Sequence, residues 1–280
     1  MTTTATTTAT TTATTTLEEL KARQQKIWSS GDYGKIAWLT VPLADVLCDA
    51  VDLRPGSRVL DVATGTGHVA LAAARRFCDV TGVDYVPALL ETARRRADAE
   101  ELPVEFREGD AEQLPFDDGS FDSVLSAIGV MFTADHQRTA DELVRVCRRG
   151  GVIGLASWTP TGFIGEMLKT VGGHVPPPPG ATPPPRWGTE EYVRELLGDR
   201  VTDVSFDTRT VTQRFPSAEF FADFFVAHYG PTLKAADSLP EENRQAFRDD
   251  LVALAERSNR ATDGSLVHNW EYLVAVAKRA

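Results

Sequence analysis

The sequence predicts an α/β protein with a doubly wound, mostly parallel sheet, and two patterns lead to this prediction. Residues 58–62 form a β-favouring apolar run that breaks into small residues and glycine, and an alanine-rich run with high helix propensity follows. This is the order strand, tight turn, helix. Strands and helices then alternate as far as residue 158, which is typical of a parallel sheet with helices on both faces.

Five strands are expected in the alternating part of the chain and two more after it. The expected strands are 58–62, 79–84, 104–107, 121–126, 152–158, 201–215 and 270–277. The helices expected from apolar periodicity are 69–77, 87–97, 134–146, 189–197, 217–228 and 241–258. Residues 161–173 have a helix-like apolar centre, and the proline-rich residues 175–185 predict an extended connector.

Two helices are expected ahead of the sheet, at 17–28 and 36–51. Gly31 and Gly34 between them would allow a hinge, so the pair could form a lid over a ligand site. A plain helix–turn–helix that packs on the core fits the same pattern equally well.

Composition and charge exclude several classes of partner. The net charge of −11 opposes broad contact with a phosphate backbone. The basic run 94–96 is followed by acids and predicts a solvated helix face. No apolar run reaches the length of about 18 residues needed to span a membrane, and no signal peptide is visible. The three scattered cysteines lack metal-ligand spacing. We expect a cytoplasmic protein that uses no nucleic acid, membrane or metal, with a homo-oligomer left open.

The turn after the first strand separates two kinds of nucleotide site. The dinucleotide pattern G-x-G-x-x-G would need a small residue at position 68, where the chain has His68. Small residues stand instead at alternate positions, as Ala63, Gly65 and Gly67. This spacing resembles the acidic-x-G-x-G-x-G motif of class I S-adenosylmethionine (SAM)-dependent methyltransferases, with Ala63 in place of the first glycine.

Further motifs extend the resemblance over roughly residues 53–158. Asp84 ends the second strand, and the stretch G-D-A at 109–111 follows the third. The stretch L-P-F-D-D-G-S-F-D-S-V at 114–124 is similar to the ubiquinone/menaquinone-biosynthesis type branch of the family. The two late strands resemble the antiparallel hairpin that ends the family's seven-stranded sheet.

The resemblance implies SAM as the cofactor and a role for each motif. Asp84 would accept hydrogen bonds from the ribose hydroxyls, and Asp110 would take the adenine amino group. The backbone at Ser126 or Ala127 would lie near the methionine part. The expected cofactor-binding residues are Ala63, Thr64, Gly65, Gly67, Asp84, Tyr85, Asp110, Ala111, Ser126 and Ala127.

The sequence patterns and the resemblance together suggest a division of the chain into five parts. These are a disordered Thr/Ala tail (1–16), lid helices (17–52), a SAM-binding core (53–160), a proline-rich insertion and cap (161–200), and a C-terminal part that completes the sheet and the acceptor pocket (201–280).

Residues that would act on a methyl acceptor are less sharply defined. His136 begins the helix after the fourth strand and is the candidate general base, although a surface or capping role fits as well. The candidates for substrate binding are Tyr33, Met131, Trp158, Phe163, Phe224 and His228. The phenylalanine stripe at 220–225 would also fit the core by periodicity alone.

The sequence therefore predicts a SAM-dependent methyltransferase that moves the sulfonium methyl to a small, largely apolar molecule by in-line displacement. Two alternatives stay open. One is an NAD(P)-dependent oxidoreductase on the same class of fold, against which His68 argues. The other is a protein of the SAM-binding fold that does not methylate, whose cofactor motifs would look the same.

Overall fold

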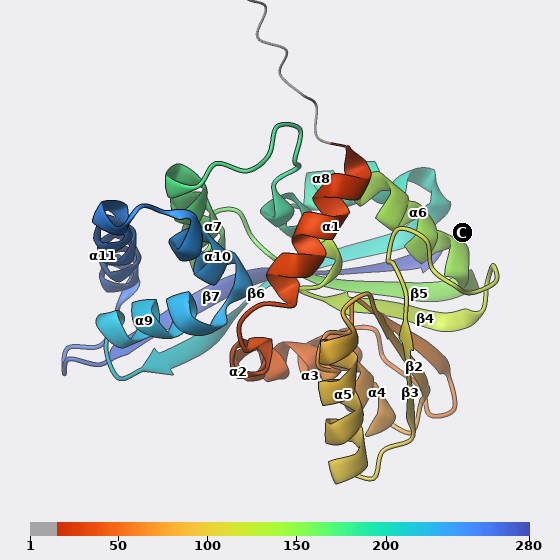
Figure 1. Ribbon diagram of the computed structural model, residues 1–280. Coiled ribbons are helices and arrows are strands. Elements are labelled where there is room, and N and C mark those ends of the chain that lie inside the picture. Colours follow the sequence, from red (N-terminus) through yellow and green to blue (C-terminus); the bar gives the residue numbers. More distant parts are fainter. Residues whose placement is uncertain (1–15) are drawn as a thin grey trace, which may run out of the picture.

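A seven-stranded sheet runs through the whole molecule (Figure 1). The structure is a computed structural model and describes residues 16–280. Its strands are β1 (Arg58–Val62), β2 (Asp79–Asp84), β3 (Val104–Glu108), β4 (Phe121–Ala127), β5 (Cys147–Trp158), β6 (Val201–Phe215) and β7 (Leu266–Arg279). Their order is β3-β2-β1-β4-β5-β7-β6, and β7 is antiparallel to both of its neighbours. The predicted fold class, including the antiparallel C-terminal strand, is confirmed.

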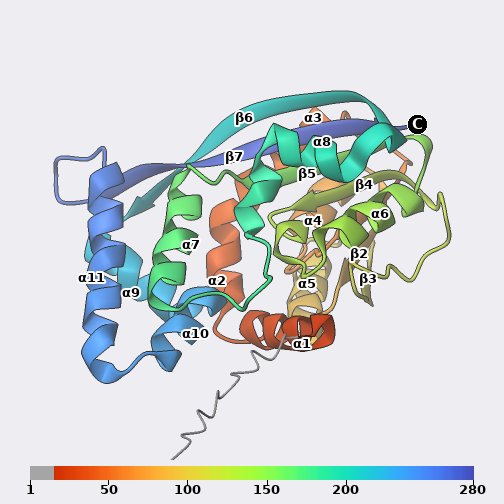
Figure 2. The same cartoon turned by 90° about the horizontal axis from the view of Figure 1, so that it is seen from above.

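Helices cover both faces of the sheet. In Figure 1, α3 (Val41–Ala50), α4 (His68–Ala74) and α5 (Pro87–Ala99) lie below it, and α6 (His136–Val146) and α8 (Glu190–Leu197) lie above it. The view from above agrees with this arrangement (Figure 2). A second group lies at one end of the sheet and consists of α7 (Phe163–His174), α9 (Ala218–His228), α10 (Gly230–Ser238) and α11 (Glu241–Ser258).

Local sequence signals explain where several helices begin. Thr16 and Glu19 form a capping box at α1 (Leu17–Trp28), in which each side chain bonds to the backbone of the other residue. The Asp135 side chain accepts from the Arg138 amide at the start of α6. Ser217 does the same for Phe220 at the start of α9. These caps satisfy backbone donors that have no partner within the helix.

The structure corrects three expected elements. The helix expected at 36–51 is divided into α2 (Tyr33–Ala37), a 3-10 turn (Trp38–Thr40) and α3, because Pro42 occupies the first turn of α3. α4 ends at Ala74, three residues before the expected end at 77. The helix α10 was not expected, and it follows α9 with only Tyr229 between them.

Other expected features match the chain or lie outside its described part. α7 forms where an apolar helix-like centre was noted, and no helix or strand occupies residues 175–183 of the proline-rich connector. Residues 1–15 of the expected Thr/Ala tail lie outside the described residues. Over residues 16–280, no helix combines the length and the apolar character that crossing a bilayer requires.

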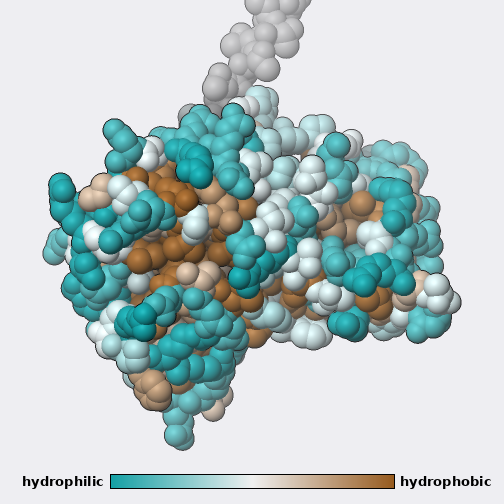
Figure 3. Space-filling view, turned by 180° about the vertical axis from the view of Figure 1, so that it is seen from behind, coloured by the Kyte–Doolittle hydropathy of each residue, from teal (hydrophilic) through white to brown (hydrophobic). Residues whose placement is uncertain are grey.

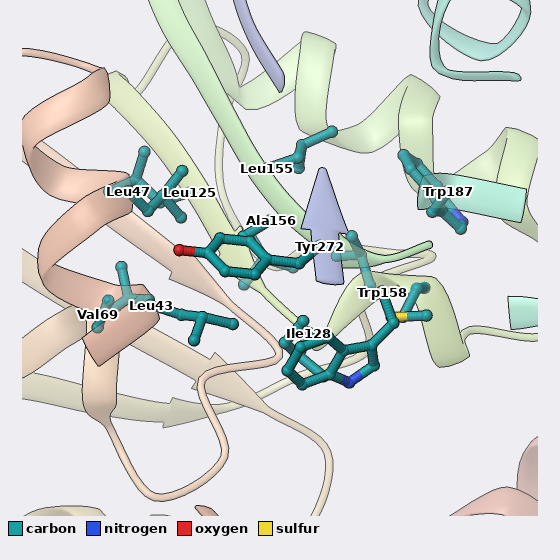
Figure 4. Packing of buried hydrophobic residues seen from close by; sticks show 14 of the residues in the cluster. Leu43, Leu47, Val69, Leu125, Ile128, Leu155, Ala156, Trp158, Trp187 and Tyr272 are labelled. Carbon is teal, nitrogen blue, oxygen red and sulfur yellow. The ribbon is translucent and has the colours of Figure 1, made fainter. Parts of the chain in front are cut away.

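Large apolar side chains on both sides of the central strands form the core. Figure 4 shows the Tyr272 ring of β7 pointing toward Leu43 and Leu47 of α3, whereas Trp187 lies on the other side of the strands. Leu43 and Leu47 have no exposed surface. The packing of α3 against the sheet therefore fixes the part of the chain that precedes β1.

The surface seen from behind carries apolar residues in a hollow between hydrophilic rims (Figure 3). The edge strand β6 lies on this side of the molecule in the view from above. Apolar surface of this kind is typical of contact sites. A homo-oligomer accordingly stays a prediction.

We expect Leu47→Ala to destabilise the fold by about 2–5 kcal/mol, because the variant leaves a cavity between α3 and the sheet. Urea unfolding at constant m-value measures this loss. Leu17→Ala is the matched control, since Leu17 is 38% exposed, and it should change the free energy of unfolding by less than about 0.5 kcal/mol. Equal losses in the two variants would contradict the packing described for α3.

Candidate functional site

A cavity of about 310 Å³ opens at the carboxyl ends of the parallel strands. Its walls come from the turn after β1, the ends of β2 and β4, and the loop after β3, and α1 forms one further wall. In open α/β sheets this edge is where ligands bind. The cavity is lined by Glu18, Lys21, Ala22, Gln24, Gln25, Trp28, Tyr33, Thr40, Ala44, Asp61, Ala63, Thr64, Gly65, Thr66, His68, Val69, Asp84, Tyr85, Leu89, Gly109, Asp110, Ala111, Glu112, Ala127, Ile128, Gly129, Phe132 and Thr133.

The buried carboxylate of Asp61 holds the glycine turn through two hydrogen bonds. The Thr64 hydroxyl donates to Asp61 Oδ2 at 2.5 Å, and the Ala70 amide donates to the same atom at 3.0 Å. The backbone of Gly65 and Gly67 is left-handed, at φ +55° and +86°. Ala63, which stands where the family motif has glycine, is also left-handed, at φ +53°. The substitution therefore keeps the turn at the cost of some backbone strain.

Asp84 joins this turn to the end of β2. Its Oδ2 accepts from the Gly65 amide at 2.8 Å, and its Oδ1 accepts from the Val86 amide at 2.9 Å. Burial raises the pKa of Asp84 to about 6, and backbone hydrogen bonds oppose this rise. Burial likewise raises the pKa of Asp61 to about 7, with a smaller contribution from the charge of Asp84. Two acids thus line the floor of the cavity, held by backbone and hydroxyl donors.

A lysine from α1 bridges two acids in the loop after β3. Lys21 Nζ lies 2.7 Å from Asp110 Oδ2 and 2.8 Å from Glu112 Oε2. The other carboxylate oxygen of Glu112 accepts from the amides of Ala134 and Asp135, just before α6. Glu112 was not among the expected site residues, because an acid at this point of the sequence carries no distinguishing pattern.

Helix α1 is held over the cavity by side chains that also line it. Gln25 Nε2 donates to the Tyr85 carbonyl at 2.6 Å. The ring of Trp28 packs against Tyr33 and Phe132, with centroids 5.4 and 4.8 Å away. Lys21, Gln25 and Trp28 are spaced by four and three residues, so they share one face of the helix. No residue of α1 is fully buried. The helix therefore covers one side of the cavity, and its action as a lid stays a prediction.

The end of the cavity next to β4 is aromatic and apolar. Trp28, Tyr33, Phe132 and Ile128 line it. Burial, together with the charge of Asp84, raises the pKa of Tyr33 to about 12, so its phenol stays neutral near physiological pH. Ile128 is left-handed, at φ +61°, which is a strained conformation for a β-branched residue. Strain of this kind is often found beside functional sites.

All of the expected cofactor-binding residues except Gly67 and Ser126 line this cavity. Gly67 caps α4 behind it, and a Cβ there would lie 3.2 Å from both Ala93 and Phe106. The Ser126 hydroxyl donates to the Val62 carbonyl and accepts from the Val130 amide, so it joins β4 to β1. Both residues act on the architecture of the site.

The candidate base and all the substrate-binding candidates except Tyr33 lie away from this cavity. His136 is buried, with Nδ1 3.0 Å from the Tyr192 hydroxyl, and burial lowers its pKa to about 4. Trp158 packs edge-on against Trp270. The remaining candidates are the fully buried Met131, Phe163 stacked on Trp270, and Phe224 beside His228.

Two of these rings have a common physical reason for their position. Trp158 and Phe163 sit where the end of β5 and the start of β7 meet α7 and α9, and they fill the apolar space between those elements. Within residues 16–280, no cluster of side chains has the composition of a metal site.

Comparison with known proteins identifies the family. A family model described as a methyltransferase domain matches residues 60–155. A demethylmenaquinone methyltransferase of Thermus thermophilus is 38% identical over 155 residues, which cover 53% of this chain and 70% of that protein. The chain belongs to the class I SAM-dependent methyltransferases of the ubiquinone/menaquinone type. The family expected from the sequence is thereby confirmed.

Other similar proteins match a larger part of the chain. An uncharacterised protein of Mycobacterium tuberculosis is 40% identical over 265 residues, or 94% of this chain and 96% of that one. A putative methyltransferase from Bacillus halodurans shares the fold, with a TM-score of 0.56 at 23% identity over 84% of this chain and 97% of that one. The [4+2]-cyclase SpnF shares the fold too, with a TM-score of 0.54 at 21% identity. The match covers 85% of this chain and 81% of that one.

The buried acid Asp61 predicts a pH-dependent stability. Its pKa rises from 3.8 to about 7 on folding, so the folded chain holds this proton more tightly than the unfolded chain does. Its contribution to stability is therefore lost as pH rises from about 4 to about 7, by up to about 1.4 kcal/mol per pH unit. Asp61→Asn removes this contribution, and thermal unfolding between about pH 5 and pH 8 should show the variant gaining stability relative to the wild type as pH rises. Parallel curves would contradict the raised pKa.

Proposed function

We propose that the cavity binds SAM and that the chain transfers its methyl group to a small, largely apolar molecule. The observation that carries the proposal is the placement of two carboxylates beside the glycine turn. Asp84 ends β2, and Asp110 follows β3, the parallel neighbour of β2. Both line the same cavity as Gly65. A carboxylate at each of two successive strand ends suits a nucleoside that offers hydroxyl and amino donors.

The residues present fit the adenosine part of SAM. Asp84 would accept hydrogen bonds from the ribose hydroxyls while it keeps its bonds from Gly65 and Val86. Asp110, whose Oδ1 already accepts from the Glu112 amide, would take the adenine amino group. The turn itself lies beside Ala127, so the methionine part would extend toward β4. When bound, SAM supplies a methyl group on an already activated sulfonium.

The contribution of the chain to the reaction is alignment and exclusion of water. Helix α1 covers the cavity, and Trp28 and Phe132 close its aromatic end. An acceptor seated against these rings would be largely apolar, because they offer carbon surface. Tyr33 is a neutral phenol at this end, so it can orient an acceptor oxygen or nitrogen by donating a hydrogen bond.

The two alternatives make different demands on the same cavity. For a dinucleotide, the side chain at position 68 should be small, yet the His68 ring fills that place and lines the cavity. A protein that does not methylate would still bind SAM, and a [4+2]-cyclase has the same fold. Mass spectrometry of the acceptor after incubation with SAM separates these outcomes, since methylation adds one methylene unit to the mass. We expect this gain.

We expect Asp84→Ala to weaken binding of S-adenosylhomocysteine (SAH), the demethylated product, by about 2 kcal/mol, or about 30-fold, because charge-assisted hydrogen bonds to the ribose are lost. Titration calorimetry measures the affinity. Asp79→Ala is the matched control, since Asp79 lies at the other end of β2 and is exposed. Equal affinity of the Asp84 variant and the wild type would refute the ribose assignment.

The affinity for SAH should also depend on pH. The ionised form of Asp84 accepts hydrogen bonds from two hydroxyls, and the pKa of this group in the folded chain is raised to about 6. As pH falls below about 6, we expect the affinity to decline by up to about tenfold per pH unit. Asp84→Asn should show weaker binding without this decline. A flat profile in the wild type would show that this carboxylate does not bind the ligand.

A further inference from the structure

The basic run in α5 contains one arginine that reaches the glycine turn. Arg94 and Arg95 are exposed: Arg94 donates to the Phe106 carbonyl of β3 at 2.8 Å, and Arg95 donates to Thr92 on its own helix. Arg96 is half-buried and reaches across to the glycine turn. Its Nη1 lies 2.6 Å from the Thr66 carbonyl oxygen, 3.3 Å from the Thr66 hydroxyl and 2.8 Å from Nδ1 of His68.

These contacts determine the state of the His68 ring. A guanidinium can only donate hydrogen bonds, so Nδ1 of His68 accepts, and the ring is neutral with its proton on Nε2. Burial, followed by the positive charge of Arg96, lowers the pKa of His68 to about 3, which agrees with a neutral ring. A hydrogen bond to the backbone of Ala37 in α2 acts in the opposite direction. The ring therefore lies between the turn and the segment that follows the cover helix.

The same contacts hold the backbone of the turn. Thr66 stands between the two left-handed glycines Gly65 and Gly67, and it is 2% exposed. Arg96 donates to its carbonyl, and a buried carbonyl that loses its donor is costly. The Gly65 amide, which donates to Asp84, lies two peptide units before this carbonyl in the same turn. A shift of the turn backbone at Thr66 would therefore also displace the amide that holds the Asp84 carboxylate.

We propose that Arg96 is a positioning residue for SAM binding, which acts through the Thr66 carbonyl and the His68 ring. Thr66 and His68 line the cavity, whereas Arg96 does not, so its effect on the ligand is indirect. The inference rests on the proposed function. It assigns a role to a residue whose sequence context, a run of three arginines followed by acids, predicts only a solvated surface.

The test compares Arg96→Met with the wild type by titration calorimetry with SAH. Methionine keeps an apolar stem and removes every donor, so we expect binding at least about tenfold weaker in a chain that still unfolds cooperatively. Arg96→Lys should fall between the two, because the shorter side chain with its compact ammonium can serve the Thr66 carbonyl but does not hold a donor where Nη1 contacts both this carbonyl and the imidazole. Nitrogen-15 NMR of the His68 ring should show an unprotonated Nδ1 in the wild type and a mixture of tautomers in Arg96→Met.

Two controls separate positioning from a general loss of stability. Arg95→Met removes the neighbouring exposed arginine and should leave the affinity unchanged. Arg248→Met removes an arginine that bonds Asp223 between α11 and α9, and neither helix contributes a residue to the cavity. It should lower the unfolding temperature without weakening SAH binding.

Each outcome decides the inference. If the wild type binds SAH and Arg96→Met binds it with the same affinity, the inference about Arg96 is overturned and the proposed function stands. An Arg96→Met variant whose His68 ring gives the same NMR tautomer signal as the wild type has the same consequence. If Arg96→Met does not fold, Arg96→Lys takes its place, and an affinity equal to that of the wild type then overturns the inference. A wild-type chain that binds no SAH overturns the proposed function and this inference with it.

Discussion

The hydrogen bond from the Gly65 amide to Asp84 connects the turn after β1 with the end of β2, and the site depends on this connection. Asp84 and Asp61 are both buried, and their main partners are backbone amides and a hydroxyl. Burial raises the pKa of each, so these acids cost free energy to ionise. A ligand with hydroxyl donors would supply the hydrogen bonds that an ionised Asp84 lacks. Under the proposed function, this floor would bind a neutral polyol such as ribose.

The cover of the cavity depends on different forces. Helix α1 has no fully buried residue, and Trp28 is its side chain that packs against the core. It is held by the ion pairs of Lys21 at one end and by the ring of Trp28 at the other. Asp110, which would bind adenine, is one of the partners of Lys21. Docking of the cover and binding of the base therefore involve the same carboxylate.

Much of the fold could be predicted because its signals are local. The residue pattern of 58–77 predicts a strand, a turn and a helix. Asp84 ends the second expected strand, and Asp110 follows the third. The division of 36–51 into α2 and α3 depends on Pro42 in the first turn of α3, which apolar periodicity alone does not take into account. Phe163 and Trp158 were expected at a pocket, but periodicity cannot distinguish a ring that lines a cavity from one that fills the core.

Contacts between distant parts of the chain were beyond the reach of sequence patterns. Lys21 bonds Asp110, which lies 89 positions later in the sequence, and no sequence pattern around either residue indicates this pairing. Arg96 likewise looks identical in sequence to its exposed neighbours, and only the packing of α5 against the turn sets it apart. The spacing of Lys21, Gln25 and Trp28 was the one available signal that this face of α1 had a partner.

A crystal structure of the chain with SAH tests the central claim most directly. We expect the ribose hydroxyls on the Asp84 carboxylate, the adenine amino group on Asp110, and α1 closed over both. An empty glycine turn, or a bound nucleoside from which Asp84 and Asp110 face away, would contradict it.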